Sequence, residues 1–122
     1  MADLTEKDIE VCDLEINDDG DGISTYLETF FDVDEKFGTS VKDDENSWVN
    51  FYAEYFPKSD ALKCIYVIDR TNSSEEHEYI PSPAEKRLII SKMEEVCRKE
   101  SACSMEELLE EYSHETPSLL FP

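Results

Sequence analysis

Side-chain oxygen atoms are the groups in this chain whose spacing could do chemistry. Asn17, Asp19 and Asp21 alternate through a short glycine-containing segment, and Glu28 follows further along. Carboxylate and amide oxygens are the ligands that hard cations such as Ca²⁺ take, and a tight turn gathers ligands that are close in sequence. The spacing therefore offers one candidate cation site, formed by these four residues.

The segment 17–28 resembles the calcium loop of the EF-hand family, with oxygen ligands at positions 1, 3, 5 and 12 and Gly22 at the sharp turn. The chain departs from the family pattern at position 1, where Asn17 replaces Asp, and at position 8, where Ser24 replaces an apolar residue. An EF-hand also needs flanking helices, whereas these flanks alternate with period 2. We therefore expect an acidic hairpin turn over 17–22 and no resident metal, with a weak calcium-binding module as the alternative.

Catalytic signals are weak. His77 and His114 both lie in polar stretches beside glutamates. The chain has no nucleophile elbow, no phosphate-binding loop and no dinucleotide fingerprint. Adjacent carboxylates are so frequent that no single pair indicates acid–base catalysis. We therefore expect no enzyme activity and no cofactor.

The charge balance narrows the choice of partner. The 122 residues contain 31 Asp and Glu against 11 Lys and Arg, a formal net charge of −20, and residues 1–46 alone hold 16 acidic and 3 basic side chains. Binding to nucleic acid or to an anionic membrane depends on Lys and Arg. The composition therefore argues against direct binding to either and favours a basic protein partner.

The termini and cysteines bear on the compartment. The N-terminus has no positive segment followed by an apolar one, and no apolar run approaches the roughly 20 residues of a membrane span. Cys12, Cys64, Cys97 and Cys103 are too few for a disulfide scaffold, and three of them sit in apolar patterns. We therefore expect a cytoplasmic protein whose thiols are reduced and mostly buried.

An acidic β-hairpin is predicted for residues 8–34. Apolar and polar residues alternate over 9–16 and again over 23–34, on either side of the turn. The alternation predicts inward-facing Cys12, Leu14, Ile16, Leu27, Phe31 and Val33, and outward-facing Asp13, Glu15, Glu28, Asp32 and Asp34.

The rest of the chain predicts a second hairpin and two helices. We expect, in order, a loop over 35–46, a hairpin over 47–69, a polar loop over 70–78, a short edge strand over 78–80, helices over 83–100 and 105–113, and a tail over 115–122. Ser82 with Glu85, and Ser104 with Glu107, have the spacing of capping boxes at the helix starts. The fold class is α+β, a single domain with an antiparallel sheet of about four strands and two C-terminal helices packed on one face.

Carboxylates on alternate strand residues stand roughly 6.7 Å apart, a pitch of the same order as the phosphate charges of a duplex, about one per 3.4 Å of axis on each strand. An acidic hairpin can therefore attract a protein that normally binds nucleic acid. The residues expected to contact the partner are Asp18, Asp19, Asp21, Glu28, Asp32, Asp34, Asp43, Asp44 and Glu45, with Tyr26 and Phe30 as aromatic anchors.

In its small size, extreme acidity and α+β pattern, the chain resembles the nucleic-acid-mimicking inhibitors of phages and mobile elements, the anti-CRISPR and anti-restriction proteins. The resemblance implies a non-catalytic inhibitor that occludes the nucleic-acid channel of a partner such as a CRISPR effector nuclease. Immunity proteins that neutralise basic nuclease toxins resemble it equally well in charge, and a surface that serves only solubility is a further alternative. The apolar residues Leu119, Leu120 and Phe121 of the tail offer a separate contact.

Overall fold

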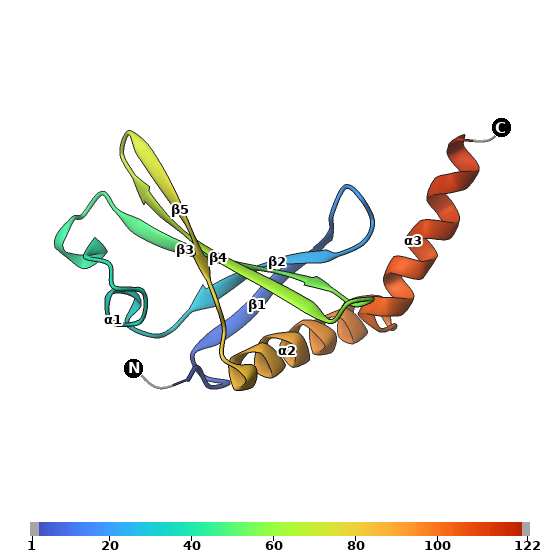
Figure 1. Ribbon diagram of the computed structural model, residues 1–122, viewed down its shortest axis with the longest axis horizontal. Helices are drawn as coiled ribbons and strands as arrows, with labels where there is room; N and C mark the ends of the chain where they lie inside the picture. The colour runs from blue at the N-terminus through green and yellow to red at the C-terminus, as the bar shows by residue number, and fades with distance from the viewer. Residues whose placement is uncertain (1–2, 121–122) are drawn as a thin grey trace.

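The computed structural model describes residues 3–120, with side chains described through Tyr112. Five antiparallel strands form one sheet in the order of the sequence, β1-β2-β3-β4-β5 (Figure 1). The strands are β1 (Ile9–Ile16), β2 (Ile23–Thr29), β3 (Trp48–Phe56), β4 (Ala61–Arg70) and β5 (Ser73–Tyr79). The helices are α1 (Val33–Phe37), the 3-10 turn η1 (Val41–Asp43), α2 (Pro83–Ser101) and α3 (Met105–Leu120). The α+β class and the antiparallel sheet are confirmed, with five strands in place of about four.

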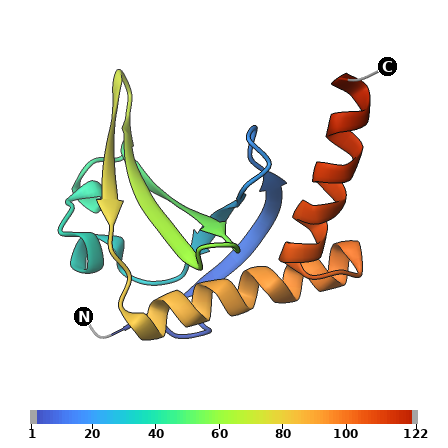
Figure 2. The ribbon, with the colours of Figure 1, turned by 45° about the vertical axis from the view of Figure 1, so that its right-hand side comes forward.

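One face of the sheet, here called the inner face, carries the core. Register places Leu14, Thr25, Ala53, Cys64 and Tyr79 in one row across all five strands. Helix α2 lies along this face (Figure 2) and buries Ile89, Met93 and Cys97 against it. The ammonium group of Lys92 adds a polar tie, donating to the carbonyls of Glu6 at 2.7 Å and Ile9 at 2.8 Å.

A bulge in β1 changes which residues face the core. Val11 pairs with Leu27, but the next partners are Leu14 and Thr25, so β1 has one residue more than β2 between the two pairs. The extra residue reverses the alternation, because side chains point to opposite faces with period 2. The prediction that Cys12 faces inward is therefore wrong. Its half-buried thiol lies on the opposite face, near a carboxylate oxygen of Glu28.

The second strand is shorter than predicted. β2 ends at Thr29, and Asp32 becomes the N-cap of α1, accepting hydrogen bonds from the amides of Asp34 and Glu35. A carboxylate at this position satisfies amides that have no partner inside the helix, which favours a turn over an extended strand. The strand predicted for 30–34 is therefore wrong, and so is the plain loop over 35–46, which contains most of α1 and the turn η1.

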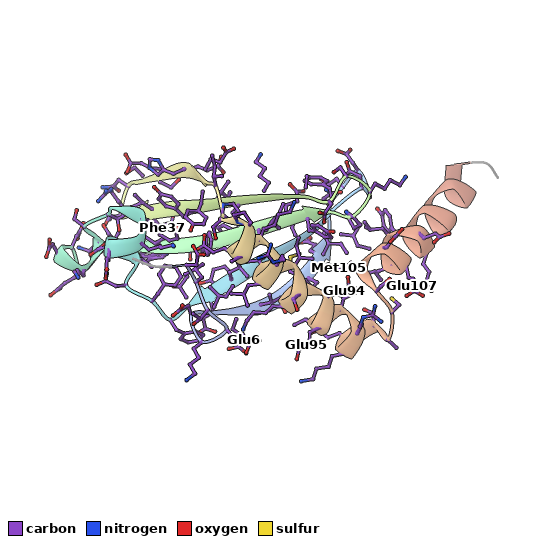
Figure 3. The ribbon with its side chains drawn as sticks, turned by 60° about the horizontal axis from the view of Figure 1, so that its bottom comes forward. Glu6, Phe37, Glu94, Glu95, Met105 and Glu107 are labelled. Carbon is purple, nitrogen blue, oxygen red and sulfur yellow. The ribbon has the colours of Figure 1, made fainter. Side chains whose placement is uncertain are left out.

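Aromatic packing explains why α1 folds back onto the sheet. The ring of Phe37 stacks on Tyr66 at 4.3 Å between centroids and also contacts Phe51 and Tyr79. Phe31 packs edge-on against Phe37 and Phe51. Figure 3, which views the molecule from the side of α2, shows Phe37 on this same side of the sheet. Both α1 and α2 therefore cover the inner face.

The polar loop predicted for 70–78 is instead most of strand β5. Residues 73–79 pair with β4 along their whole length, from Ser73 opposite Arg70 to Tyr79 opposite Cys64. The expected edge strand over 78–80 is only the end of it. All residues from Ser73 to Glu78 are exposed. Without a buried face, this edge strand shows no apolar alternation to reveal it.

The two C-terminal helices begin where predicted but are arranged differently. Both capping boxes are present: Ser82 with Glu85 in α2, and Ser104 with Glu107 in α3, where Ser104 Oγ accepts from the Glu107 amide at 3.1 Å. The chain turns at Ala102, whose φ of 57° ends α2. Two helices packed flat on one face were expected, whereas only α2 lies there. α3 buries Met105 and Leu109 at its start and then projects away from the sheet (Figure 1).

α3 is also longer than the predicted 105–113. It continues to Leu120 and includes most of the residues expected as a tail over 115–122. Residues 121–122 lie outside the described residues, as do the side chains of Leu119 and Leu120. A contact made by Leu119, Leu120 and Phe121 stays a prediction.

A buried carboxylate joins four parts of the inner side. Glu85, in the first turn of α2, is 2% exposed. Its Oε2 accepts from the Leu4 amide at 3.0 Å and the Lys36 ammonium at 2.8 Å. Its Oε1 accepts from the Tyr79 hydroxyl at 2.7 Å and the Ser82 amide at 2.9 Å. The N-terminal segment, α1, β5 and α2 therefore share one acceptor.

These donors decide the ionisation of Glu85. Burial alone raises the pKa of a carboxyl group, but the hydrogen bonds from Lys36, Ser82, Tyr79 and Leu4 favour the charged form and lower the pKa of Glu85 to about 2. A depressed pKa in the folded state stabilises the fold above the unfolded pKa near 4.5, and the contribution disappears as the pH falls towards 2. The shift corresponds to about 3 kcal/mol.

We predict that Glu85→Gln lowers the free energy of unfolding at pH 7 by about 3 kcal/mol, because it removes the buried carboxylate that bonds the Lys36 ammonium at 2.8 Å. Urea denaturation of the protein and the variant should show this gap narrowing as the pH falls from about 4.5 towards 2. Glu100→Gln, an exposed change on the same helix, should shift stability by less than about 0.5 kcal/mol. A Glu85→Gln gap that stays constant down to pH 2 would contradict the assignment.

Candidate functional site

The opposite face of the sheet, here called the outer face, is the one that no helix covers within residues 3–120. Register places Tyr26, Tyr52, Ile65 and Glu78 in one row across β2 to β5. Helices α1 and α2 both lie on the inner side (Figures 1 and 2), and in this row Tyr26, Tyr52 and Glu78 are exposed and Ile65 is half-buried. A sheet with one uncovered face normally makes that face polar.

The charged side chains of the outer face are almost all acidic. By register and alternation its carboxylates number eight against one cation, Lys63. They come from all five strands: Glu10, Asp13, Glu15, Glu28, Glu54, Asp69, Glu76 and Glu78. Glu10 and Glu28 are one strand spacing apart, roughly 5 Å, and the eight carboxylates together give the face a negative potential.

One pair of carboxylates on the outer face, Glu10 and Glu28, is not explained by the stability of the fold. Glu10 lies directly opposite Glu28 on the neighbouring strand. Like charges in this position destabilise a sheet. By contrast, two other carboxylates have local partners: Glu54 accepts from Asn17 Nδ2 at 2.8 Å, and Asp69 accepts from Asn50 Nδ2. Lys63 lies opposite Glu54 on β4 and not beside Glu10 and Glu28, so the fold tolerates the repulsion between these two carboxylates.

Cys12 and Tyr26 lie beside this repulsive pair and are held neutral. Burial and the carboxylates of Glu28 and Glu10 raise the pKa of the Cys12 thiol. Burial, with neighbouring acidic groups, likewise raises the pKa of Tyr26. Both groups therefore stay protonated at neutral pH, so the outer face presents carboxylates and neutral hydroxyls and no thiolate nucleophile.

Aromatic side chains lie among the carboxylates. Trp48 is 53% exposed, and Tyr26 and Tyr52 are each 37% exposed. The two tyrosine rings meet edge to face, with centroids 5.6 Å apart. Half-buried Ile65 and Val67 of β4 continue the apolar surface. Exposed aromatics with a polar surround are typical of protein-binding surfaces.

These tyrosines form one wall of a hollow, here called the tyrosine hollow. It has a volume of about 440 Å³. Tyr26, Tyr52 and Ile65 supply its apolar part, and Ser24 and the side chains of Asp13, Glu15, Glu54 and Lys63 its polar part.

The structure separates the residues predicted to contact a partner. Tyr26 and Glu28 lie on the outer face. Asp18, Asp19 and Asp21 lie in the β1–β2 turn, at the end of the sheet next to α3, where Tyr112 contacts Gly20. Asp19 and Asp21 line a second hollow there with Lys58 and residues of α3. The predicted residues therefore form more than one surface.

The remaining acidic candidates lie near α1, at the other end of the sheet. Asp32 and Asp34 are not on the outer face as predicted. Asp32 caps α1 and pairs with Lys42 at 3.1 Å, and Asp34 accepts from the hydroxyl of Thr39 and the amides of Val41 and Lys42. These bonds lower the pKa of both carboxyls and are local to the α1–η1 segment.

Asp44 also has a local role, accepting from the Ser47 hydroxyl at 2.6 Å and from the Asn46 amide at 3.0 Å. Asp43 and Glu45 are exposed beside it, and Phe30, which follows β2, is 56% exposed. These three residues are thus accessible at this end of the sheet.

The EF-hand interpretation of 17–28 is wrong, because the segment joins two strands. Asn17 Oδ1 accepts from the amides of Asp21 at 3.2 Å and Gly22 at 3.4 Å, so its oxygen closes the turn. Glu28 lies about 17 Å along β2 from Ile23, at roughly 3.3 Å per residue. Among the described residues, no group of three His, Cys, Asp or Glu side chains could hold a metal ion.

Sequence reasoning missed the half of the site contributed by β3 to β5. Trp48, Tyr52 and Glu54 lie on one face of the predicted strand 48–56, but that strand has aromatics on both faces, so its solvent side was not identified. Glu76 and Glu78 lay in a segment taken for a loop. The signal that was available is Trp48, Asn50, Tyr52 and Glu54 alternating with buried residues.

Helix α2, on the inner side, has nearly balanced charge. Helix α2 holds five of the basic residues and four acidic ones, a net charge of +1, which leaves −21 for the remainder of the chain. Lys86, Arg87 and Arg98 line a groove on α2 together with Asp60, Glu94 and Glu95. The helix is therefore close to neutral, whereas the outer face is strongly acidic.

No family model matches the chain, and no curated protein or solved structure is significantly similar to it. Within residues 3–120, no helix has the length and apolar character needed to cross a bilayer.

We predict that Glu28→Gln raises the free energy of unfolding by about 0.5 kcal/mol at low salt, because it removes the repulsion from Glu10. Glu78→Gln is the matched control, since Glu78 faces Ile65 across the strands and not a carboxylate. Thermal or urea denaturation measures both, and the difference should shrink in 1 M salt. Equal gains for the two variants would show that Glu10 and Glu28 do not repel.

Proposed function

We propose that this protein is a non-catalytic inhibitor that binds a basic nucleic-acid-binding site of a partner protein and occludes it, as a nucleic-acid mimic. The observation that carries the proposal is the outer face, where eight carboxylates and exposed aromatics surround a single lysine on a sheet face without a helix. A partner such as an effector nuclease has the complementary charge.

The spacing of the charges supports mimicry. On β5, Glu76 and Glu78 are alternate residues and stand roughly 6.7 Å apart, and Glu10 of β1 lies opposite Glu28 of β2 at a strand spacing of roughly 5 Å. A duplex has a phosphate charge per 3.4 Å of axis on each strand. The two charge densities are of the same order, so cations placed to bind phosphates also find carboxylates here.

The aromatic residues add affinity that charge alone does not provide. Ion pairs at the rim of an interface mainly steer association, whereas buried aromatics account for much of the binding energy. Trp48, Tyr52 and Tyr26 supply these anchors between the carboxylates. The mimic therefore binds through both carboxylates and aromatic side chains, and part of its affinity should remain at high salt.

The charge distribution also orients the protein. Helix α2 holds five of the 11 basic residues and is close to neutral, so a positive partner is attracted more strongly to the outer face than to the α2 side. Asp18, Asp19 and Asp21 at one end, and Asp43 and Glu45 at the other, extend the negative surface beyond the sheet.

We predict that reversing Glu28, Glu76 and Glu78 to Lys abolishes capture of the partner. Tagged protein is incubated with cell extract, and bound proteins are eluted with salt or with duplex DNA and identified by mass spectrometry. The control reverses Glu95, Glu100 and Glu111, three exposed helical residues, and makes the same change in net charge. This variant should retain the partner, because its changes lie away from the outer face.

The proposal is supported if the captured protein is nucleic-acid-binding, is displaced by DNA and is lost only with the outer-face variant. A partner released by neither salt nor DNA, or lost equally with both variants, would contradict it. A captured nuclease toxin would identify the protein as an immunity protein acting through the same surface.

A further inference from the structure

We infer that the tyrosine hollow receives an arginine side chain of the basic partner. This inference rests on the proposed function and deepens it, since it specifies which cation the outer face recognises and where. The basis of the inference is that the tyrosine hollow, on the uncovered outer face, has an apolar wall and a rim of carboxylates, which complement the positive charge of a guanidinium.

The two tyrosine rings make the recess suitable for a flat cation. Tyr26 and Tyr52 are paired across β2 and β3, and their planes meet at 62°, so the rings form a corner and not a closed stack. An arginine guanidinium stacks on an aromatic face through both dispersion and cation–π attraction. Each tyrosine is 37% exposed, so ring surface remains available to a ligand.

The rim supplies acceptors beside the rings. Glu15 and Glu54 lie in the row next to Tyr26 and Tyr52, on either side of Ser24, and Asp13 follows at the bulge. The side-chain amide of Asn17 donates to Oε2 of Glu54 at 2.8 Å and fixes the position of this carboxylate. A planar guanidinium can stack on an aromatic ring and, at the same time, donate two parallel hydrogen bonds to a carboxylate.

The ammonium of a lysine fits less well. It is a compact, strongly hydrated point charge that does not stack, and it gains less from the tyrosine corner. Lys63 already lies at the same hollow, opposite Glu54 on β4. An incoming arginine therefore stacks in the corner formed by the two tyrosine rings and bonds the carboxylates on the side away from Lys63, those of Asp13 and Glu15.

The test is a titration of isotope-labelled protein, followed by NMR, with two acetylated and amidated pentapeptides, Ala-Arg-Ala-Arg-Ala and Ala-Lys-Ala-Lys-Ala. The inference predicts that the arginine peptide binds at least about threefold more tightly and shifts the signals of Tyr26, Tyr52 and Glu15. Tyr52→Leu, which keeps an apolar side chain, should weaken the arginine peptide about fivefold and the lysine peptide much less.

Ile80→Ala is the control, because Ile80 is a hydrophobic residue that is 80% exposed but does not line the hollow. It should leave the preference for arginine unchanged. Equal affinities for the two peptides, or an equal loss in both variants, would overturn the inference.

These outcomes are separate from those that test the proposed function. Suppose that Tyr52→Leu captures the partner as well as the unmodified protein does, but the variant with Glu28, Glu76 and Glu78 reversed does not capture it. The arginine site is then wrong, and binding through the acidic outer face is still supported. If neither variant affects capture, both ideas fail.

Discussion

The arrangement of this molecule depends on one buried carboxylate. Glu85 accepts four hydrogen bonds at the start of α2, from the N-terminal segment, α1, β5 and the helix cap. Each of these segments can satisfy Glu85 only from the inner side of the sheet. The same interaction that builds the core therefore draws the helical segments to one face and leaves the outer face open.

That division of the sheet also separates the charge. The buried Glu85 is neutralised by Lys36, and α2 is close to neutral, so nearly all of the negative charge lies elsewhere. A protein selected only for stability would not place Glu10 opposite Glu28. Under the proposed function, a cationic partner surface that covers the outer face relieves this repulsion, which links the stability of the free protein to binding.

Local patterns in the sequence were enough for much of the fold. Alternation located β1, the first part of β2 and β3, and a continuous apolar stretch located β4. The pairs Ser82 with Glu85 and Ser104 with Glu107 located the helix starts. What failed depended on tertiary context. The bulge that turns Cys12 outward leaves the local alternation intact, and Asp32 looks the same as a strand residue and as a helix cap. Strand β5 has no buried face, so nothing in its composition distinguishes it from a loop. The candidate site was found in part for the same reason: Tyr26 and Glu28 could be placed from their own hairpin, whereas Glu76 and Trp48 join them only through the pairing of distant strands.

The most direct test of the central claim is carboxylate footprinting of the protein alone and bound to its captured partner. A carbodiimide couples an amine to accessible Asp and Glu side chains, and mass spectrometry locates the modified residues. The account predicts protection of Glu10, Glu28, Glu76 and Glu78 in the complex, with Glu95 and Glu100 of α2 labelled as in the free protein. Protection of the α2 glutamates with the outer face still labelled would contradict it.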